Sequence, residues 1–377
     1  MKVVSQAFIT LSLILLPLSA KSQEPAYKSI EDTTALVQDE QPKKIGLIRR
    51  IIRGFDRLDT AYIEPQHYLF TVMLQGTYTY DYYTLRSGIL DGQSISFAND
   101  GMWKLGPYIG WKWFFGGYAF TLGHSTYDKT KTEIDLSLYS SQIGIDLFYR
   151  RTGSDYKLRN VHIKGQGQDQ LQRFEDLPFD GLRVGVAGAD LYYIFNHGHF
   201  SYPAAFAQST GQKISCGSWL AGIGFTHNSL DFDYDKLQKL LDEHIPEQEV
   251  KLDSGFLFKA AEYYNIGISG GYAYNWVFAK NWLLSGSGQA AMAYKQSKGK
   301  TEEKSKEQRF SLTKISPYFI GRFGLVYNNT KWYAGFSAIV HSNYYLESRF
   351  STKNTFGSMN LYVGYNFGLK KRYKDKK

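Results

Sequence analysis

The clearest pattern in the chain is a strict alternation of apolar and polar residues between Tyr264 and Tyr294. Apolar residues or glycine occupy every second position from Tyr264 to Trp276 and again from Trp282 to Tyr294. Because successive side chains of a β-strand point to opposite faces, this spacing predicts two strands. The residues between them, 277–281, are predicted to form a tight turn.

The two faces of this hairpin differ in a way that indicates its surroundings. One face carries mostly small, hydrophilic residues (Asn, Ser, Gly and Gln), which do not suit the dry core of a soluble sandwich. The apolar face ends in aromatic residues on both sides: Tyr264 and Tyr294 at one end, Trp276 and Trp282 at the other. An apolar outer band with aromatic girdles and a polar interior is typical of a transmembrane β-barrel.

The same alternation recurs along the chain and predicts an all-β fold, a transmembrane antiparallel β-barrel over residues 66–369. We predict about twelve strands; ten or fourteen remain open, because residues 155–163 and 198–215 are ambiguous. A parity change in the strand around Gly188 predicts a β-bulge there, and 235–244 reads as a short helix in a long loop. Besides the hairpin, the predicted strands are 68–80, 104–113, 118–122, 142–150, 157–163, 182–196, 219–225, 319–327, 332–340 and 359–369.

The connections between the predicted strands suggest an orientation. Short turns at Gly116-Gly117, at 277–280 and at Asn328-Asn329 alternate with long polar loops. Short turns of such barrels face the periplasm and long loops face outward, so both chain termini are predicted to be periplasmic. The predicted location is the outer membrane of a Gram-negative-type cell envelope.

The segments outside the barrel have their own signals. A basic residue, an apolar run and the small residues Ala20 and Ser22 predict a cleaved signal peptide over 1–22. Residues 23–43 are predicted to be a flexible periplasmic leader. Residues 44–60 form an amphipathic helix with basic residues off its apolar stripe, which caps the barrel, lies on the inner leaflet or enters the lumen. Residues 370–377 are a basic tail, solvated or in contact with anionic headgroups.

Composition narrows the chemistry. The 377-residue chain has a formal net charge of +9 and a mean hydropathy of −0.36, and Cys216 is its single cysteine. One cysteine excludes an intramolecular disulfide and a cysteine-based zinc cluster, and no metal or cofactor is predicted. No nucleic-acid motif accompanies the positive charge. The expected partners are outer-membrane lipid, lipopolysaccharide and the barrel-assembly machinery; nothing in the sequence indicates an oligomeric state.

Three segments are similar to an uncharacterised family of bacterial outer-membrane barrels. They are Tyr62-Ile63-Glu64-Pro65 with Tyr68, Phe70 and Met73; the run from Phe200 to Phe206; and Gly271-Tyr272 with Asn275-Trp276. Together they resemble the domain of unknown function 4421, across nearly the whole mature chain. The resemblance implies an outer-membrane barrel and brings no established activity.

Charged residues on the predicted inner face are the first candidates for function. Charges on this face tune what a pore admits. The alternative is a network of ion pairs that fills a narrow barrel, which the presence of both signs favours. These candidates are Asp81, Lys104, Lys112, Asp146, Arg150, Asp190, Arg322 and His341.

An enzyme is less favoured. His341 and Ser342 are adjacent in a predicted strand and therefore point to opposite faces, so they cannot form a base–nucleophile pair. His197-Gly198-His199 offers two ligands where a metal site needs three or four. We predict a non-enzymatic barrel, a narrow channel or transporter for small polar solutes. The alternatives are a structural scaffold or adhesin-like barrel and, less favoured, a barrel-embedded lipid hydrolase.

Overall fold

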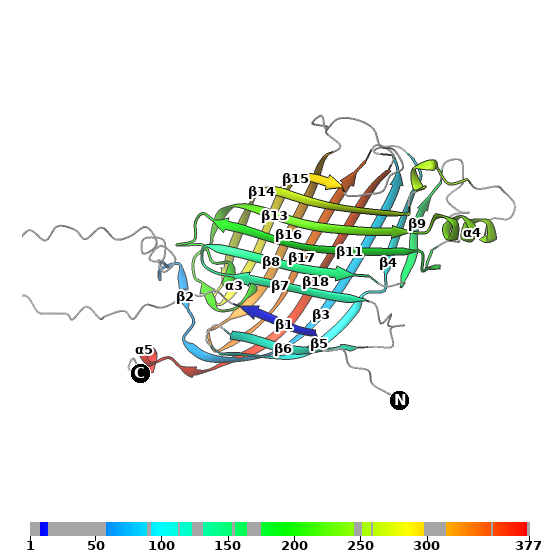
Figure 1. Ribbon diagram of the computed structural model, residues 1–377. Coiled ribbons are helices and arrows are strands. Elements are labelled where there is room, and N and C mark those ends of the chain that lie inside the picture. Colours follow the sequence, from blue (N-terminus) through cyan, green and yellow to red (C-terminus); the bar gives the residue numbers. More distant parts are fainter. Residues whose placement is uncertain are drawn as a thin grey trace, which may run out of the picture.

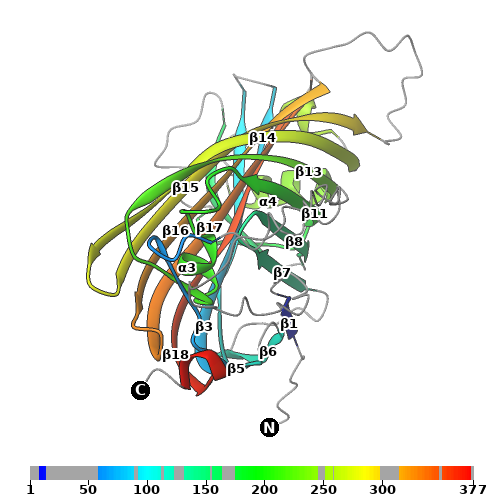
Figure 2. The same ribbon diagram turned by 90° about the vertical axis from the view of Figure 1, so that its left-hand side faces the viewer.

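Most strands of the protein belong to one antiparallel sheet that curls into a barrel (Figures 1 and 2). The computed structural model describes residues 8–13, 58–88, 92–111, 114–122, 131–152, 155–163, 175–244, 251–257, 259–297, 314–347 and 350–374. In spatial order the wall strands are β6 (Phe114–Leu122), β5 (Met102–Trp111), β3 (Tyr68–Ser87), β18 (Phe350–Leu369), β17 (Trp332–Leu346), β16 (Ile315–Asn328), β15 (Trp282–Ser297), β14 (Ala260–Ala279), β13 (Cys216–Phe232), β11 (Leu182–Ile194), β8 (Ile143–Arg151) and β7 (Thr132–Tyr139).

The sheet has a seam between its two last strands. In the described part of the chain, β6 and β7 share no backbone ladder. Instead β1 (Phe8–Leu13) pairs with β6 and contacts β7. Because the hydrogen-bonded path is open at this seam, the number of strands in the closed wall stays a prediction.

The alternation seen in the sequence is the alternation of the wall. Ile268 and Met292 are 71% and 69% exposed on the outer face, whereas the inward Ala273 and Ser285 are each 1% exposed. The two strands β14 and β15 meet at a turn of only Lys280 and Asn281, and Asn281 takes a positive φ of 67° that a tight turn requires. The predicted all-β fold is confirmed.

One wall strand was missed, and one predicted strand lies outside the wall. Residues 132–139, with no predicted strand, form wall strand β7, in which polar and apolar residues alternate. Residues 157–163 fall in β9 (Tyr156–His162), which lies off the wall and pairs with β4 (Ser94–Asn99) and β10 (Pro178–Phe179).

Two local predictions were also wrong. Gly116 and Gly117 lie within β6 and not in a turn; a side chain at Gly117 would collide with the Tyr108 ring of β5. β11 runs through Gly188 without a register shift against either neighbour. The apolar residues change sides in the sequence because the barrel interior is itself apolar around the first half of β11, where Val184 and Val186 point inward.

An apolar cap fills the end of the barrel that carries the long connections, called the loop end below. Inward residues such as Tyr83 and Phe356 of the wall pack there against Phe97 of β4 and Phe256 of the 3-10 helix η2 (Ser254–Phe256). The predicted helix is present as α4 (Tyr234–His244), and its Leu237 and Leu241 join the same cluster. Phe148 and Phe356, from β8 and β18, lie 5.5 Å apart across the interior, so the cluster spans the lumen.

The segments outside the wall are described in part. Of the predicted signal peptide only β1 is described; the predicted leader (23–43), and 44–57 of the predicted helix, lie outside the described residues, while 58–60 are irregular chain entering a turn. In the tail, α5 (Lys371–Lys374) follows Lys370, whose ammonium group donates to Gln66 O and whose pKa burial lowers. No helix in the described residues is long and apolar enough to span a membrane.

Candidate functional site: a plugged chamber inside the barrel

Residues 198–215 form a plug at the opposite end of the barrel, where the short turns lie (the turn end). The plug contains α3 (Tyr202–Phe206) and β12 (Thr210–Gln212). The helix begins locally for clear reasons: Ser201 Oγ accepts from Ala204 N at 3.2 Å, and Pro203 lies in the first turn, where its missing N–H costs nothing. Helix α3 contacts β7, β15 and β16, so it lies inside the curve of the sheet (Figure 2).

Gln212 holds the plug together. Its side-chain oxygen accepts from Ser201 N at 3.0 Å and from Asn275 Nδ2 of the wall at 3.1 Å. Its side-chain nitrogen donates to His199 O at 2.7 Å and to Ile214 O at 3.0 Å. One buried amide therefore links the helix, the strand and the wall.

A second chain segment, which lies just before β3 in the sequence, also binds the plug. β2 (Ile63–Pro65) pairs with β12, and Lys213 N donates to Tyr62 O at 2.7 Å. Asn275 Nδ2 also donates to Ser201 O at 2.9 Å. The segments 62–65, 200–206 and 275–276, which carried the family resemblance in the sequence, thus meet at one place.

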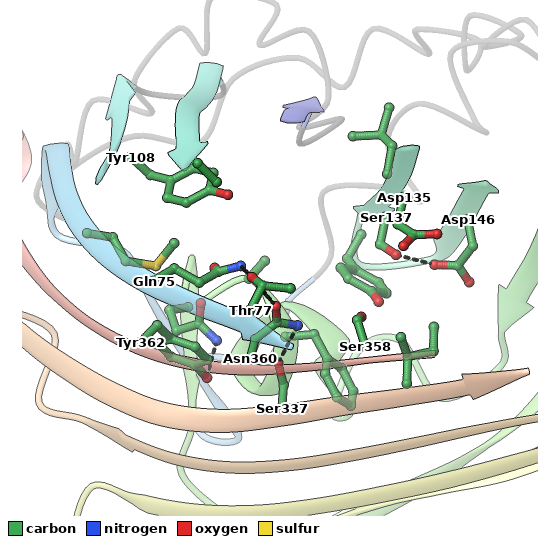
Figure 3. Close-up of a pocket in the computed structure, with 18 of the residues that line it drawn as sticks. Gln75, Thr77, Tyr108, Asp135, Ser137, Asp146, Ser337, Ser358, Asn360 and Tyr362 are labelled. Atoms are coloured by element: carbon green, nitrogen blue, oxygen red, sulfur yellow. Dashed lines mark hydrogen bonds between the residues drawn. The ribbon is translucent and has the colours of Figure 1, made fainter. Parts of the chain in front are cut away.

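Between the plug and the apolar cap lies a cavity of about 610 Å³, which we call the chamber. Its wall combines inward residues of β3, β5, β7, β8, β16, β17 and β18 with Phe206, Ala207, Gln208 and Ser209 of the plug. Figure 3 shows hydroxyl, amide and carboxylate groups projecting into it, among them Thr77, Asn360, Ser358 and Asp135. The chamber lining therefore combines polar and charged groups with a larger share of apolar surface, aromatic rings included.

Three ion pairs line the chamber. Arg322 of β16 pairs with Asp146 of β8, from the far side of the barrel. Arg150 of β8 pairs with Asp135 at 2.6 Å, and its guanidinium also donates to Tyr80 O at 3.2 Å on β3. The Arg322–Asp146 pair and the Arg150–Tyr80 hydrogen bond join strands that are not neighbours in the sheet, whereas Arg150 and Asp135 lie on the neighbouring strands β8 and β7.

The third pair bridges the seam. Lys104 Nζ of β5 lies 3.0 Å from Glu133 Oε2 of β7, and Thr79 Oγ1 of β3 donates to the same oxygen at 3.0 Å. Side chains thus connect the two sides of the seam in place of a backbone ladder.

The structure brings together most of the predicted inner charges. Six of the eight are strand residues that are at most 8% exposed and belong to the ion pairs of the chamber or lie near them. His341 is also buried, with its ring centroid 5.1 Å from that of Phe356. Lys112 lies outside the described residues. The six buried strand residues are Asp81, Lys104, Asp146, Arg150, Asp190 and Arg322.

Two of these carboxylates, Asp190 and Asp81, form no ion pair with another described residue. Asp190 accepts a hydrogen bond from Tyr318 OH at 3.3 Å. Asp81 is buried, and its Oδ1 has no hydrogen-bond partner within the described ranges. Glu133 and Asp135, which neutralise two of the cations, were missed with their strand; the alternation of Glu133, Asp135 and Ser137 against Ile134, Leu136 and Leu138 is the signal that identifies both.

The predicted girdle residues lie on the outside. Trp276, Trp282 and Tyr294 are exposed, and Tyr264 is half-exposed and stacks on His227 with the ring centroids 4.4 Å apart. Trp276 and Trp282 flank the turn of the β14–β15 hairpin, while Tyr264 and Tyr294 lie toward its opposite end.

The histidines considered in the sequence, His341, His197 and His199, make separate local contacts. His341 points inward, whereas the hydroxyl group of Ser342 contacts Thr355 Oγ1 at 3.1 Å on the neighbouring strand. His199 lies 3.4 Å from Asp59 and His197 lies 3.0 Å from Gln142 Nε2. Among the described residues no group of three or more His, Cys, Asp or Glu side chains is arranged to hold a metal ion.

The fold and the chamber define the class: an antiparallel β-barrel with a plugged lumen. The chain belongs to the family described as Domain of unknown function (DUF4421), whose model matches residues 57–367. The family resemblance of the sequence is thereby confirmed. No curated protein matches the chain with significant similarity.

Three solved structures have weak similarity to the chain. The outer membrane protease OmpT from Escherichia coli is 9% identical, with 83% of this chain and 100% of that chain covered and a TM-score of 0.35. The toluene transporter TodX of P. putida is 10% identical (80% and 91% covered, TM-score 0.21). OprG from Pseudomonas aeruginosa is 10% identical (81% and 98% covered, TM-score 0.22). Values this low support no inference about activity.

Proposed function

We propose that this protein is an outer-membrane barrel that admits small polar solutes through its chamber when the plug moves. The observation that supports this proposal is that plug residues 206–209 form part of the wall of a cavity of about 610 Å³, which is also lined by hydroxyl, amide and charged side chains. Displacing the plug therefore opens the chamber at the turn end. A scaffold or adhesin-like barrel gives this cavity no role.

The outer face supports a place in a bilayer. Large apolar side chains are exposed on nearly every wall strand, which is costly in water over so wide a surface and favourable in lipid. In this proposal the protein contacts outer-membrane lipid and lipopolysaccharide, is inserted by the barrel-assembly machinery, and keeps its turn end and termini in the periplasm. The exposed apolar side chains of the wall include Ile109, Trp219, Ile223, Ile266, Ile268 and Leu361.

The bilayer placement predicts a position-dependent cost of charge. Ile268→Arg is expected to lower the free energy of unfolding by about 2–4 kcal/mol, because arginine in the middle of the lipid face is costly. The matched control is Leu257→Arg, at a residue that is 62% exposed but lies off the wall; its cost is expected to be within about 0.5 kcal/mol. Urea titrations in phospholipid vesicles give both values. Equal costs would argue against lipid around Ile268.

The plug is expected to control passage. Gln212→Ala removes the partner of the buried Ser201 N–H and one hydrogen bond each from Asn275 and His199 O, at about 1–3 kcal/mol for each group left unsatisfied. We expect at least about a tenfold rise in the open fraction of single barrels, since 1.4 kcal/mol is a factor of ten. Planar-bilayer recordings measure this.

The control for that recording is Gln289→Ala, a buried glutamine of β15 that does not touch the plug. It is expected to leave the open fraction unchanged. A barrel that carries no current as wild type and as Gln212→Ala would end the channel proposal in favour of a scaffold.

The proposal assigns no catalysis to the protein. His341 and Ser342 of β17 are adjacent in the strand and are divided between the two faces of the sheet. A triad needs base and nucleophile within hydrogen-bond reach.

A further inference from the structure

We propose that the chamber binds a neutral, polyhydroxylated solute, a sugar or a polyol. This inference rests on the proposed function and names the substrate class of the same chamber. Three features carry it: the balance of charge, a shelf of amides and hydroxyls, and the tyrosine rings beside that shelf.

The charges that line the chamber cancel. Among the described residues that line the chamber, Lys104, Arg150 and Arg322 pair with Glu133, Asp135 and Asp146, so three cations face three carboxylates. A site that selects an ion presents a ring of one sign to it. An anion or cation entering this chamber would have to compete with an existing partner, whereas a neutral molecule would not.

The hydrogen-bonding groups that remain are amides and hydroxyls. Gln75 Nε2 and Thr77 Oγ1 of β3 both donate to Asn360 Oδ1 of β18, at 3.0 and 2.8 Å. Asn360 Nδ2 makes only a long contact of 3.5 Å to Ser337 Oγ. All four residues are partly accessible on the chamber side, and together they form the amide–hydroxyl shelf (Figure 3).

The shelf presents both donors and acceptors. The Asn360 amide has N–H capacity left, and Gln75 Oε1 accepts no hydrogen bond within the described ranges. Hydroxyl groups of a sugar both donate and accept, so they match such a surface without carrying charge. Fixed amides of this kind reject a molecule that cannot hydrogen-bond, because the buried partner would remain unsatisfied.

Aromatic rings border the shelf toward the turn end. Tyr108, Tyr333 and Tyr362 pack with Met73 in one cluster, and all four line the chamber. Tyr108 projects from β5 toward the space above the shelf (Figure 3). Sugar rings have C–H faces as well as hydroxyl edges, and tyrosine offers an apolar face with a polar tip. The volume of about 610 Å³ falls within the range of small-molecule sites.

The test measures binding of matched probes to the purified full chain in lipid nanodiscs, free of sugar-headgroup detergent. The probes are D-glucose and D-sorbitol as neutral molecules, D-gluconate as the anion and D-glucosamine as the cation. Isothermal titration is expected to give at least about tenfold tighter binding of a neutral probe than of either charged one. Asn360→Ala is expected to weaken that binding about tenfold, as loss of one good hydrogen bond does.

Two further variants keep the test decisive. Asn265→Ala removes a buried inward asparagine of β14 that does not line the chamber, and it is expected to leave the affinity unchanged. Asn360→Asp keeps the shape of the side chain and adds a charge, so it is expected to shift preference toward D-glucosamine. Preference of the wild type for a charged probe, or no binding of any probe, overturns the inference; the proposed passage fails separately, on conductance.

Discussion

Asp146→Ala is expected to lower the free energy of unfolding by about 3–5 kcal/mol, the usual cost of stranding one partner of a buried ion pair. Arg322, 4% exposed, lies with its guanidinium carbon 4.9 Å from the centre of the Tyr192 ring. Within the described residues Asp146 is its one ion-pair partner. Without that carboxylate, a full positive charge remains inside the barrel.

The location of the pair increases its effect. Asp146 is on β8 and Arg322 on β16, so their contact ties together strands separated by four others on one side of the wall. Asp146 Oδ1 also accepts from Ser137 Oγ of β7 at 2.6 Å. Loss of the carboxylate therefore loosens the wall next to the seam as well as across the lumen.

Urea unfolding in phospholipid vesicles, followed by tryptophan fluorescence, measures the cost. The control is Asp180→Ala, which removes the partner of Lys236 in a pair exposed on the loop end; surface pairs contribute about 0–1 kcal/mol. In the double variant with Asp146→Leu and Arg322→Met most of the loss should be recovered, because no lone charge remains. Equal costs at Asp146 and Asp180 would contradict a dry, paired chamber.

The wall could be predicted from the sequence because lipid outside and polar groups inside impose period two on β14 and β15. The prediction failed where the interior is not polar. At Val184 and Val186 the inside is the apolar cap, and a change of parity that looked like a bulge is a change of environment. At β9 the alternation is genuine, but it faces the cap and not the lumen.

The chamber was predictable only in part. The alternation of polar and apolar residues placed Asp146 and Arg322 on the inner face. It carries no information on whether these two residues, 176 positions apart, contact each other. The ion pairs of Lys104 and Arg150 could not be predicted, because their partners Glu133 and Asp135 lie on β7, which was not predicted as a strand. The plug was visible only as a break in pattern, since its stability comes from β2 and from Gln212, contacts that no period in the sequence encodes.

Fixing the plug to the wall is expected to abolish passage through the barrel. Ala205 of α3 faces Gly324 of β16, and a Cβ added at Gly324 would lie 3.7 Å from that of Ala205. Disulfides have Cβ atoms about 3.5–4.5 Å apart, so Ala205→Cys with Gly324→Cys fits this geometry. Cys216, the single native cysteine, is replaced by serine to leave one possible bridge.

The decisive measurement is the planar-bilayer current through this double-cysteine barrel, first oxidised and then after dithiothreitol is added, beside Cys216→Ser alone. We expect no current in the oxidised state. After reduction, we expect the same channel openings as with Cys216→Ser alone. The same current in both redox states, with the bridge verified by mass spectrometry, would contradict a plug that must move for solute to pass.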